Sequence, residues 1–170
     1  NDAGRQMDIL TLSTWLRYLE LCGVSIPFPG NAYQGDYVID MAKMIKEAHG
    51  DRYVHQPHTL VVLTTPANES SISSEDERLD QLIQAAKEIL SEDYVYIHQF
   101  VLTEQLGDCR NDLMEFGVEF DTWFSEQSLF DNGLIARAIA MLEKNQMIYQ
   151  QDGALWFRST QFGDEKDRVV

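Results

Sequence analysis

Hydrophobic positions recur at intervals of three and four residues over several long segments, and this period predicts helices. The first helix is expected over Met7–Cys22, followed by Gly23 at the position of a C-terminal cap. Its apolar stripe consists of Leu12, Trp15, Leu16, Leu19 and Cys22. Two prolines and a glycine predict a loop at Ile26–Asn31. A second helix is expected over Gly35–His49, and Gly50 ends it.

Two further helices are expected in the middle of the chain. The segment before them, residues 51–74, is polar, with one apolar run at Leu60–Leu63 that fits either a short strand or a loop anchor. Ser74 and Glu77 have the spacing of a capping box and begin a helix. Its inward positions are Leu79, Leu82, Ile83, Ala86 and Leu90. Another helical pattern covers Tyr94–Phe116, with Leu102, Leu106, Cys109, Leu113 and Phe116 on one stripe and Gly117 as the cap.

The last third of the chain mixes short strands with one helix. Val118–Asp121 alternates apolar and polar residues, which predicts a short strand. A helix over Asn132–Asn145 would bury Leu134 or Ile135 together with Ala138, Ile139 and Leu142. The runs 147–150 and 154–157, joined by a turn at 151–153, predict a β-hairpin, and a further strand begins at 169–170. The predicted class is α/β and mostly helical, without the parallel strands that a complete doubly wound fold needs.

Composition limits the partners of the chain. Its 170 residues fit one domain, or one domain with an appendage, and 44% hydrophobic with 24% charged residues is ordinary for a globular protein. Thirteen basic residues face 28 acidic ones, for a net charge of −15, so this chain is not expected to present the main binding surface for a nucleic acid. The sequence contains no run of 18 or more apolar residues, so it does not predict a membrane span.

The cysteines and histidines do not predict a metal site. Cys22 and Cys109 lie on apolar stripes far apart in sequence, so both are expected to be buried free thiols. His55 and His58 are three residues apart, but Pro57 between them argues against a helix that would present both on one face. The other histidines are His49 and His98. No HExxH motif and no cysteine pair is present.

Two groups of polar residues are candidates for binding a ligand. Glu126 follows the predicted strand and a turn that contains Trp123, so its carboxylate stands at the end of an aromatic wall. A fixed carboxylate is a natural partner for the planar donor fork of a guanidinium. On this pattern alone, a surface glutamate is the better explanation of Glu126. Trp123 is most simply a core anchor, although its place beside Glu126 suggests contact with substrate.

The second group opens the chain and consists of Asn1, Asp2, Gly4 and Gln6. A glycine between polar residues, running into a helical pattern, predicts the turn that starts a helix, a common place to hold a ligand. Capping of the helix by Asp2, with Gly4 for the turn, explains the same residues without a ligand. Because no initiator Met precedes Asn1, we expect the chain to be an internal piece of a larger enzyme.

Five segments of the chain resemble bacterial arginyl-tRNA synthetases, which are class I synthetases, and they follow the order of that family. They are 1–8 (NDAGRQMD), 15–18 (WLRY), 33–37 (YQGDY), 120–126 (FDTWFSE) and 152–160 (DGALWFRST). The resemblance implies a partial nucleotide-binding, Rossmann-like catalytic domain with a helical connective insertion and a small β-hairpin. It implies catalytic-domain residues at 1–46, a variable helical insertion at 47–92, and a connective and catalytic segment at 93–170.

The resemblance also implies roles for single residues. A glutamate in the FDTWFSE block contacts the guanidinium of the substrate in that family, which gives this role to Glu126; some relatives have Gly-Glu-Ser here, so the following serine is spaced differently. More distant members show Gly-Asp-x-Gly-x-Gln at the start of the chain, which places Asp2, Gly4 and Gln6 close to the active-site cleft, whereas Asn1 departs from that pattern.

The implied activity is that of an arginine–tRNA ligase. The parent enzyme would activate L-arginine with ATP and Mg²⁺ and transfer it to tRNA(Arg) in the cytoplasm, and activation would require bound tRNA. The family's His-x-Gly-His motif and its Lys-Met-Ser-Lys-like loop are absent from these 170 residues. We therefore expect the isolated chain to be inactive, to bind no cofactor alone and to depend on the remainder of the same polypeptide. The alternative is a free-standing, acidic, helical protein-interaction domain derived from a synthetase.

Overall fold

The computed structural model describes residues 2, 4–64 and 74–170, and it divides the chain into two units at the boundary between Trp123 and Phe124. The first unit contains α1 (Arg5–Leu21), α2 (Asp36–His49), the 3₁₀ helix η1 (Pro57–Leu60), α3 (Val61–Thr64), α4 (Glu75–Leu90) and α5 (Glu92–Glu115). The second contains α6 (Gln127–Asp131), α7 (Leu134–Lys144), β1 (Ile148–Gln151), β2 (Ala154–Phe157), the 3₁₀ helix η3 (Ser159–Phe162) and β3 (Arg168–Val169). The described chain is thus mostly helical, with one small sheet.

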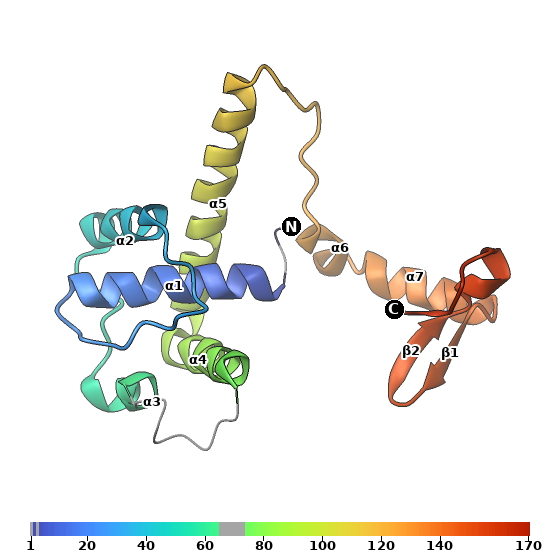
Figure 1. Cartoon of the computed structure of the whole chain (residues 1–170), viewed down its shortest axis with the longest axis horizontal. Coiled ribbons are helices and arrows are strands. Elements are labelled where there is room, and N and C mark those ends of the chain that lie inside the picture. The colour runs from blue at the N-terminus through green and yellow to red at the C-terminus, as the bar shows by residue number, and fades with distance from the viewer. Residues whose placement is uncertain (1, 3, 65–73) are drawn as a thin grey trace. The chain divides into compact units, whose positions relative to one another are not determined.

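The first unit is built around α1, which packs against α2, α4 and α5 (Figure 1). The predicted helix is confirmed, but it is not buried along one stripe only. Thr11, Ser13 and Thr14 are fully buried along with the apolar positions between Met7 and Leu19. The Thr11 and Ser13 hydroxyls donate to backbone carbonyls one turn earlier, at 2.8 and 2.6 Å, which allows these polar side chains to lie inside. A helix covered on all sides in this way is the centre of its core.

The predicted helix boundaries in this unit are confirmed by their caps. Gly23 has φ +84°, and its N–H and that of Val24 donate to the carbonyls of Glu20 and Leu19, the two bonds of a Schellman motif. Ser74 Oγ accepts the Glu77 N–H at 3.1 Å, as the capping-box spacing predicted. All five inward positions predicted for the helix that follows are buried in α4.

The apolar run Leu60–Leu63 is helical, so its assignment as a strand was wrong. It spans the end of η1 and most of α3. Leu60 and Leu63 are both buried against the core, which confirms the other interpretation, an anchor for this segment. The two residues are three apart, so one helical turn presents both to the same side, whereas in a strand they would face opposite ways.

The apolar stripe predicted for Tyr94–Phe116 is buried only in part. Tyr94, Ile97 and Val101 of α5 are buried, whereas no residue of this fully described helix is buried from Leu102 onward. Phe116 retains 87% of its accessible surface. The reason is visible in Figure 1, where the second half of α5 extends past the other helices of its unit. The cysteines were also wrongly expected inside, since Cys109 is exposed on this half of α5 and Cys22 is only half-buried.

The second unit confirms the predicted hairpin and extends it to three strands. β1 and β2 pair antiparallel from Ile148–Phe157 to Gln151–Ala154, and β3 adds to β2 in the order β1-β2-β3. Asp152 and Gly153 form the two-residue turn with φ of +51° and +79°, the positive angles of a type I′ turn. The helix predicted before the hairpin is present as α7, although none of its residues is fully buried and Ala138 is exposed.

The strand predicted at Val118–Asp121 is wrong. The segment is irregular and exposed, and the three strands of the described chain all lie in the second unit. Alternation of apolar and polar residues favours a strand only where a neighbouring strand satisfies the backbone, and none pairs with this segment among the described residues.

Candidate functional site

The candidate residues at the start of the chain lie at the N-terminus of α1. Gly4 occupies the N-cap position with φ +93°, an angle that only glycine adopts readily, so the predicted turn is present. Its carbonyl accepts the Met7 N–H at 3.1 Å and thereby starts the helix. The Tyr33 hydroxyl donates to Gln6 Oε1 at 2.6 Å and ties this turn to the loop that precedes α2. Asp2 is half-buried, while Asn1 lies outside the described residues.

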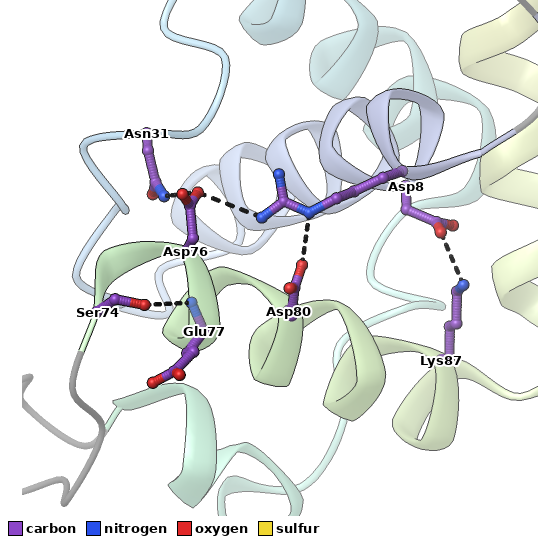
Figure 2. A network of polar contacts seen from close by, with 8 residues as sticks. Asp8, Asn31, Ser74, Asp76, Glu77, Asp80 and Lys87 are labelled. Atoms are coloured by element: carbon purple, nitrogen blue, oxygen red, sulfur yellow. Dashed lines mark hydrogen bonds and ion pairs between the residues drawn. The ribbon is translucent and has the colours of Figure 1, made fainter. Parts of the chain in front are cut away.

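A charged network that the sequence did not reveal lies one turn further along α1. Asp8 accepts hydrogen bonds from Lys87 Nζ at 2.9 Å and from the Tyr94 hydroxyl at 2.7 Å (Figure 2 shows the contact with Lys87). Burial, and then the hydrogen bond to Asp8, raise the pKa of Tyr94 far above its usual range, so Tyr94 remains a donor at any physiological pH. Asp8 therefore joins α1 to α4 and to α5 at the end of α1 that carries the candidate turn.

His98 of α5 completes this cluster, and its ring lies 6.3 Å from that of Tyr94. Burial lowers the pKa of His98 below its ordinary value of about 6.5. Lys87 acts in the same direction, whereas the negative charges of Asp8 and Asp2 oppose it. The negative charge of Asp2 thus acts on His98 in the same direction as that of Asp8.

The lowered pKa of His98 predicts a pH-dependent stability. As the pH falls through about 6.5, the unfolded chain binds the histidine proton before the folded chain does, so the free energy of unfolding decreases until the folded pKa is passed. We expect His98→Gln to lose less stability than the natural chain between pH 7.5 and pH 5.5. Urea unfolding of both proteins at the two pH values measures this difference, and an equal loss in both would contradict the prediction.

A second network, largely exposed, surrounds Arg5. Its Nε donates to Asp80 Oδ1 at 2.7 Å and its Nη2 to Asp76 Oδ1 at 3.3 Å, while Asn31 Nδ2 also donates to Asp76 Oδ1 at 3.3 Å (Figure 2). These contacts connect the start of α1 and the loop before α2 with the first turns of α4. Exposed ion pairs contribute about 0–1 kcal/mol each, so the network orients the start of α1 more than it stabilises the unit.

Trp123 lies at the end of the first unit, beside a cavity of about 350 Å³ that Arg110, Glu119 and Phe120 also line. The Arg110 guanidinium lies 4.7 Å from the centroid of the Trp123 ring, and Phe120 meets the same ring edge-on at 5.8 Å. Trp123 remains 38% exposed, so its interpretation as a core anchor does not describe its environment. The face of the Trp123 indole is thus in contact with a cation of the same unit.

Glu126 lies in the second unit, at the N-cap position of α6, and is exposed. The turn that presents it is held by its neighbours: Ser125 Oγ accepts the Ser128 N–H at 3.2 Å, and the Ser128 hydroxyl donates to the Ser125 carbonyl at 2.6 Å. The Leu129 N–H donates to the Glu126 carbonyl at 3.0 Å. The backbone on both sides of Glu126 is therefore fixed by hydrogen bonds.

The histidine, cysteine and acidic side chains do not form a metal site in the part of the chain that the structure describes. Among residues 2, 4–64 and 74–170, no three histidine, cysteine or acidic side chains are grouped so that they could hold a metal ion. η1 begins at Pro57, after His55, so His55 and His58 do not share the face of a helix. Likewise, no helix of the described residues is long and apolar enough to cross a membrane.

The chain is similar over its whole length to proteins named arginine–tRNA ligase. It is 68% identical to that of Nitrosomonas europaea and 64% identical to that of Nitrosospira multiformis, covering 100% of this chain and 29% of each relative. A solved structure from Campylobacter jejuni, described as an arginyl-tRNA synthetase, matches all of this chain with 30% of its own, at 27% identity and a TM-score of 0.59. No protein-family model matches the chain.

These similarities identify the class of protein as the aminoacyl-tRNA synthetases. Within that class the chain belongs to the arginine–tRNA ligases, to which it is related from its first residue to its last. The resemblance that the five sequence segments indicated is thereby confirmed. The chain spans about 30% of the length of the curated relatives it matches.

Proposed function

We propose that this chain acts as part of an arginine–tRNA ligase, which activates L-arginine with ATP and transfers it to tRNA(Arg). The observation that carries the proposal is the 68% identity with an arginine–tRNA ligase over the full length of the chain. Such identity favours this function over a free-standing interaction domain, because the match extends over the whole chain and therefore over the regions of all five segments on which the resemblance rests.

In this proposal the chain contributes to substrate binding. Glu126 holds the guanidinium of arginine, and Asp2, Gly4, Gln6 and Trp123 belong to the active-site cleft. The exposed, braced position of Glu126 and the braced turn at Gly4 support these roles. A carboxylate that accepts two parallel N–H bonds from a guanidinium gives both affinity and selectivity for arginine.

ATP, Mg²⁺ and most of the tRNA would be bound by residues outside these 170, in a cytoplasmic enzyme. The net charge of −15 supports this division, since phosphates are bound by basic surfaces. Residues 1–46 and 93–170 would then belong to a Rossmann-like catalytic domain and its connective segment, and residues 47–92 would be a variable insertion. Catalysis itself would consist of positioning arginine against the α-phosphate and stabilising the charge that develops there.

The test is arginine-dependent ATP–pyrophosphate exchange in the presence of tRNA(Arg). A polypeptide as long as the relatives, in which this chain forms the corresponding segment, is expected to catalyse ATP–pyrophosphate exchange. The 170-residue chain alone is expected to show no exchange above background. Lysine in place of arginine serves as the control for specificity. Exchange by the short chain alone, or its absence in the long polypeptide, would contradict the proposal.

A further inference from the structure

The N-cap residue of α1 has no side chain with which to cap the helix. Gly4 occupies this position, where Ser, Thr, Asp or Asn would accept a hydrogen bond from a backbone N–H of the first turn. A side-chain cap of that kind holds the start of a helix locally. The orientation of the first turn of α1 therefore depends on contacts that the residues around Gly4 make with other parts of the unit.

The ion pairs that the described residues of α1 make with α4 all come from this first turn. Arg5 pairs with Asp80 at 2.7 Å and with Asp76 at 3.3 Å, and Asp8 pairs with Lys87 at 2.9 Å (Figure 2). The charges on α1 are positive and then negative, and those facing them along α4 are negative and then positive. A shift of α4 along α1 would bring like charges together, so these pairs fix the register of the two helices.

Asp8 is the residue of this turn that contacts both α4 and α5. It accepts hydrogen bonds from Lys87 Nζ at 2.9 Å and from the Tyr94 hydroxyl at 2.7 Å. The Asp8 side chain is only 22% exposed and Tyr94 is buried, whereas the Lys87 side chain is 39% exposed. Tyr94 is therefore part of the core, while Lys87 holds Asp8 from the surface and can be changed without opening the core.

The turn held in this way is one that the proposed function places in the active-site cleft. Gly4 and Gln6 lie within four residues of Asp8, and Gln6 Oε1 accepts the Tyr33 hydroxyl at 2.6 Å. Lys87, by contrast, lies in the segment 47–92, which the proposed function treats as a variable insertion. The contact between Asp8 and Lys87 therefore connects that segment to the cleft.

We propose that Asp8 and Lys87 are positioning residues, whose ion pair fixes the start of α1 so that α4 sets the position of the turn at Gly4 in the active-site cleft. The inference rests on the proposed function, because that function gives the turn its role. Lys87 acts through Asp8 and does not touch substrate. The segment 47–92 thus takes part in the reaction by holding a neighbouring turn in place.

The experiment reverses the charge of Lys87 in a polypeptide of full synthetase length. Lys87→Glu places a carboxylate beside that of Asp8, and their repulsion displaces the start of α1. We expect arginine-dependent ATP–pyrophosphate exchange to fall about tenfold, since a misplacement of about 1 Å in an active site can cost up to about a hundredfold. The rate is divided by the folded fraction from circular dichroism, so a loss of stability alone does not change it. Lys87→Arg keeps the charge and should keep the natural rate.

A double variant tests whether the effect passes through the ion pair. Asp8→Lys with Lys87→Glu restores the pair with its charges exchanged, and the Tyr94 hydroxyl can accept a hydrogen bond as well as donate one. We expect this variant to exchange faster per folded molecule than either single variant. Lys87→Met removes the charge without repulsion, should lose less activity than Lys87→Glu, and remains measurable if the glutamate variant does not fold.

Lys43→Glu is the matched control, because it makes the same change of charge at a lysine whose ion pair lies within one helix. Lys43 of α2 is 54% exposed and pairs with Asp40 at 2.8 Å, so its replacement should leave the rate unchanged. The inference is overturned if Lys87→Glu or Lys87→Met keeps the natural rate, if Lys43→Glu loses as much as Lys87→Glu, or if the double variant is no faster than both single variants. An unaltered long polypeptide without exchange activity refutes the proposed function instead.

Discussion

Replacing Glu126 with alanine in a polypeptide of full synthetase length is expected to raise the KM for L-arginine by at least about thirtyfold. Removing one partner of a hydrogen-bonded charge pair at a binding site costs on the order of 2–5 kcal/mol, and the lower limit corresponds to about thirtyfold in affinity. In the chain alone Glu126 is exposed at the start of α6, so this cost arises when arginine and the rest of the enzyme cover it. Arginine-dependent exchange at saturating ATP and tRNA measures the effect.

The split between KM and kcat distinguishes substrate binding from a structural role. An interaction made equally in the ground state and the transition state changes KM and leaves kcat nearly constant, whereas a misfolded enzyme loses active sites and therefore kcat. Glu126→Gln keeps the shape and removes the charge, so it should resemble the alanine variant. Glu143→Ala removes the same charge from an exposed position on α7 and serves as the control. An unchanged KM in Glu126→Ala would refute the role of Glu126.

The sequence predicted those parts of the structure that are determined by residues close to one another in the chain. The Schellman motif at Gly23, the cap at Ser74 and the turn at Asp152–Gly153 depend on residues within a few positions of one another. The sequence did not predict which side chains are buried where burial depends on distant parts of the chain. Thr11 and Ser13 look like the polar side of α1, yet they are buried because their hydroxyls are satisfied by their own helix.

The same limit explains what was missed in the candidate site. The contacts of Asp8 with Lys87 and Tyr94 span 79 and 86 residues, and the spacing of these residues in the sequence does not predict them. Arg110 and Trp123 were separated by a predicted strand, so a ring contact between them was not expected. By contrast, the turn at Gly4 was predicted from a short motif, since a glycine turn before a helix is a local feature.

Replacing Trp15 with alanine is expected to remove on the order of 3–5 kcal/mol from the free energy of unfolding of the chain. Trp15 is 0% exposed at the centre of α1, and its indole N–H donates to the Tyr53 carbonyl at 3.1 Å. The same loop is held by Tyr18, whose hydroxyl accepts the Tyr53 N–H at 3.1 Å. Truncation therefore leaves a cavity and also an unpaired buried carbonyl, two separate losses of stability.

Urea unfolding followed by circular dichroism measures this loss, with Leu21→Ala as the control on the same helix. Leu21 is 36% exposed and should cost only about 1 kcal/mol or less. Trp15→Phe keeps most of the volume but not the N–H donor, so it should fall between the two and remains measurable if the alanine variant does not fold. A loss below about 1 kcal/mol in Trp15→Ala would mean that α1 is not the centre of an independent core. A loss of the expected size would mean that the first unit is stabilised by its own packing.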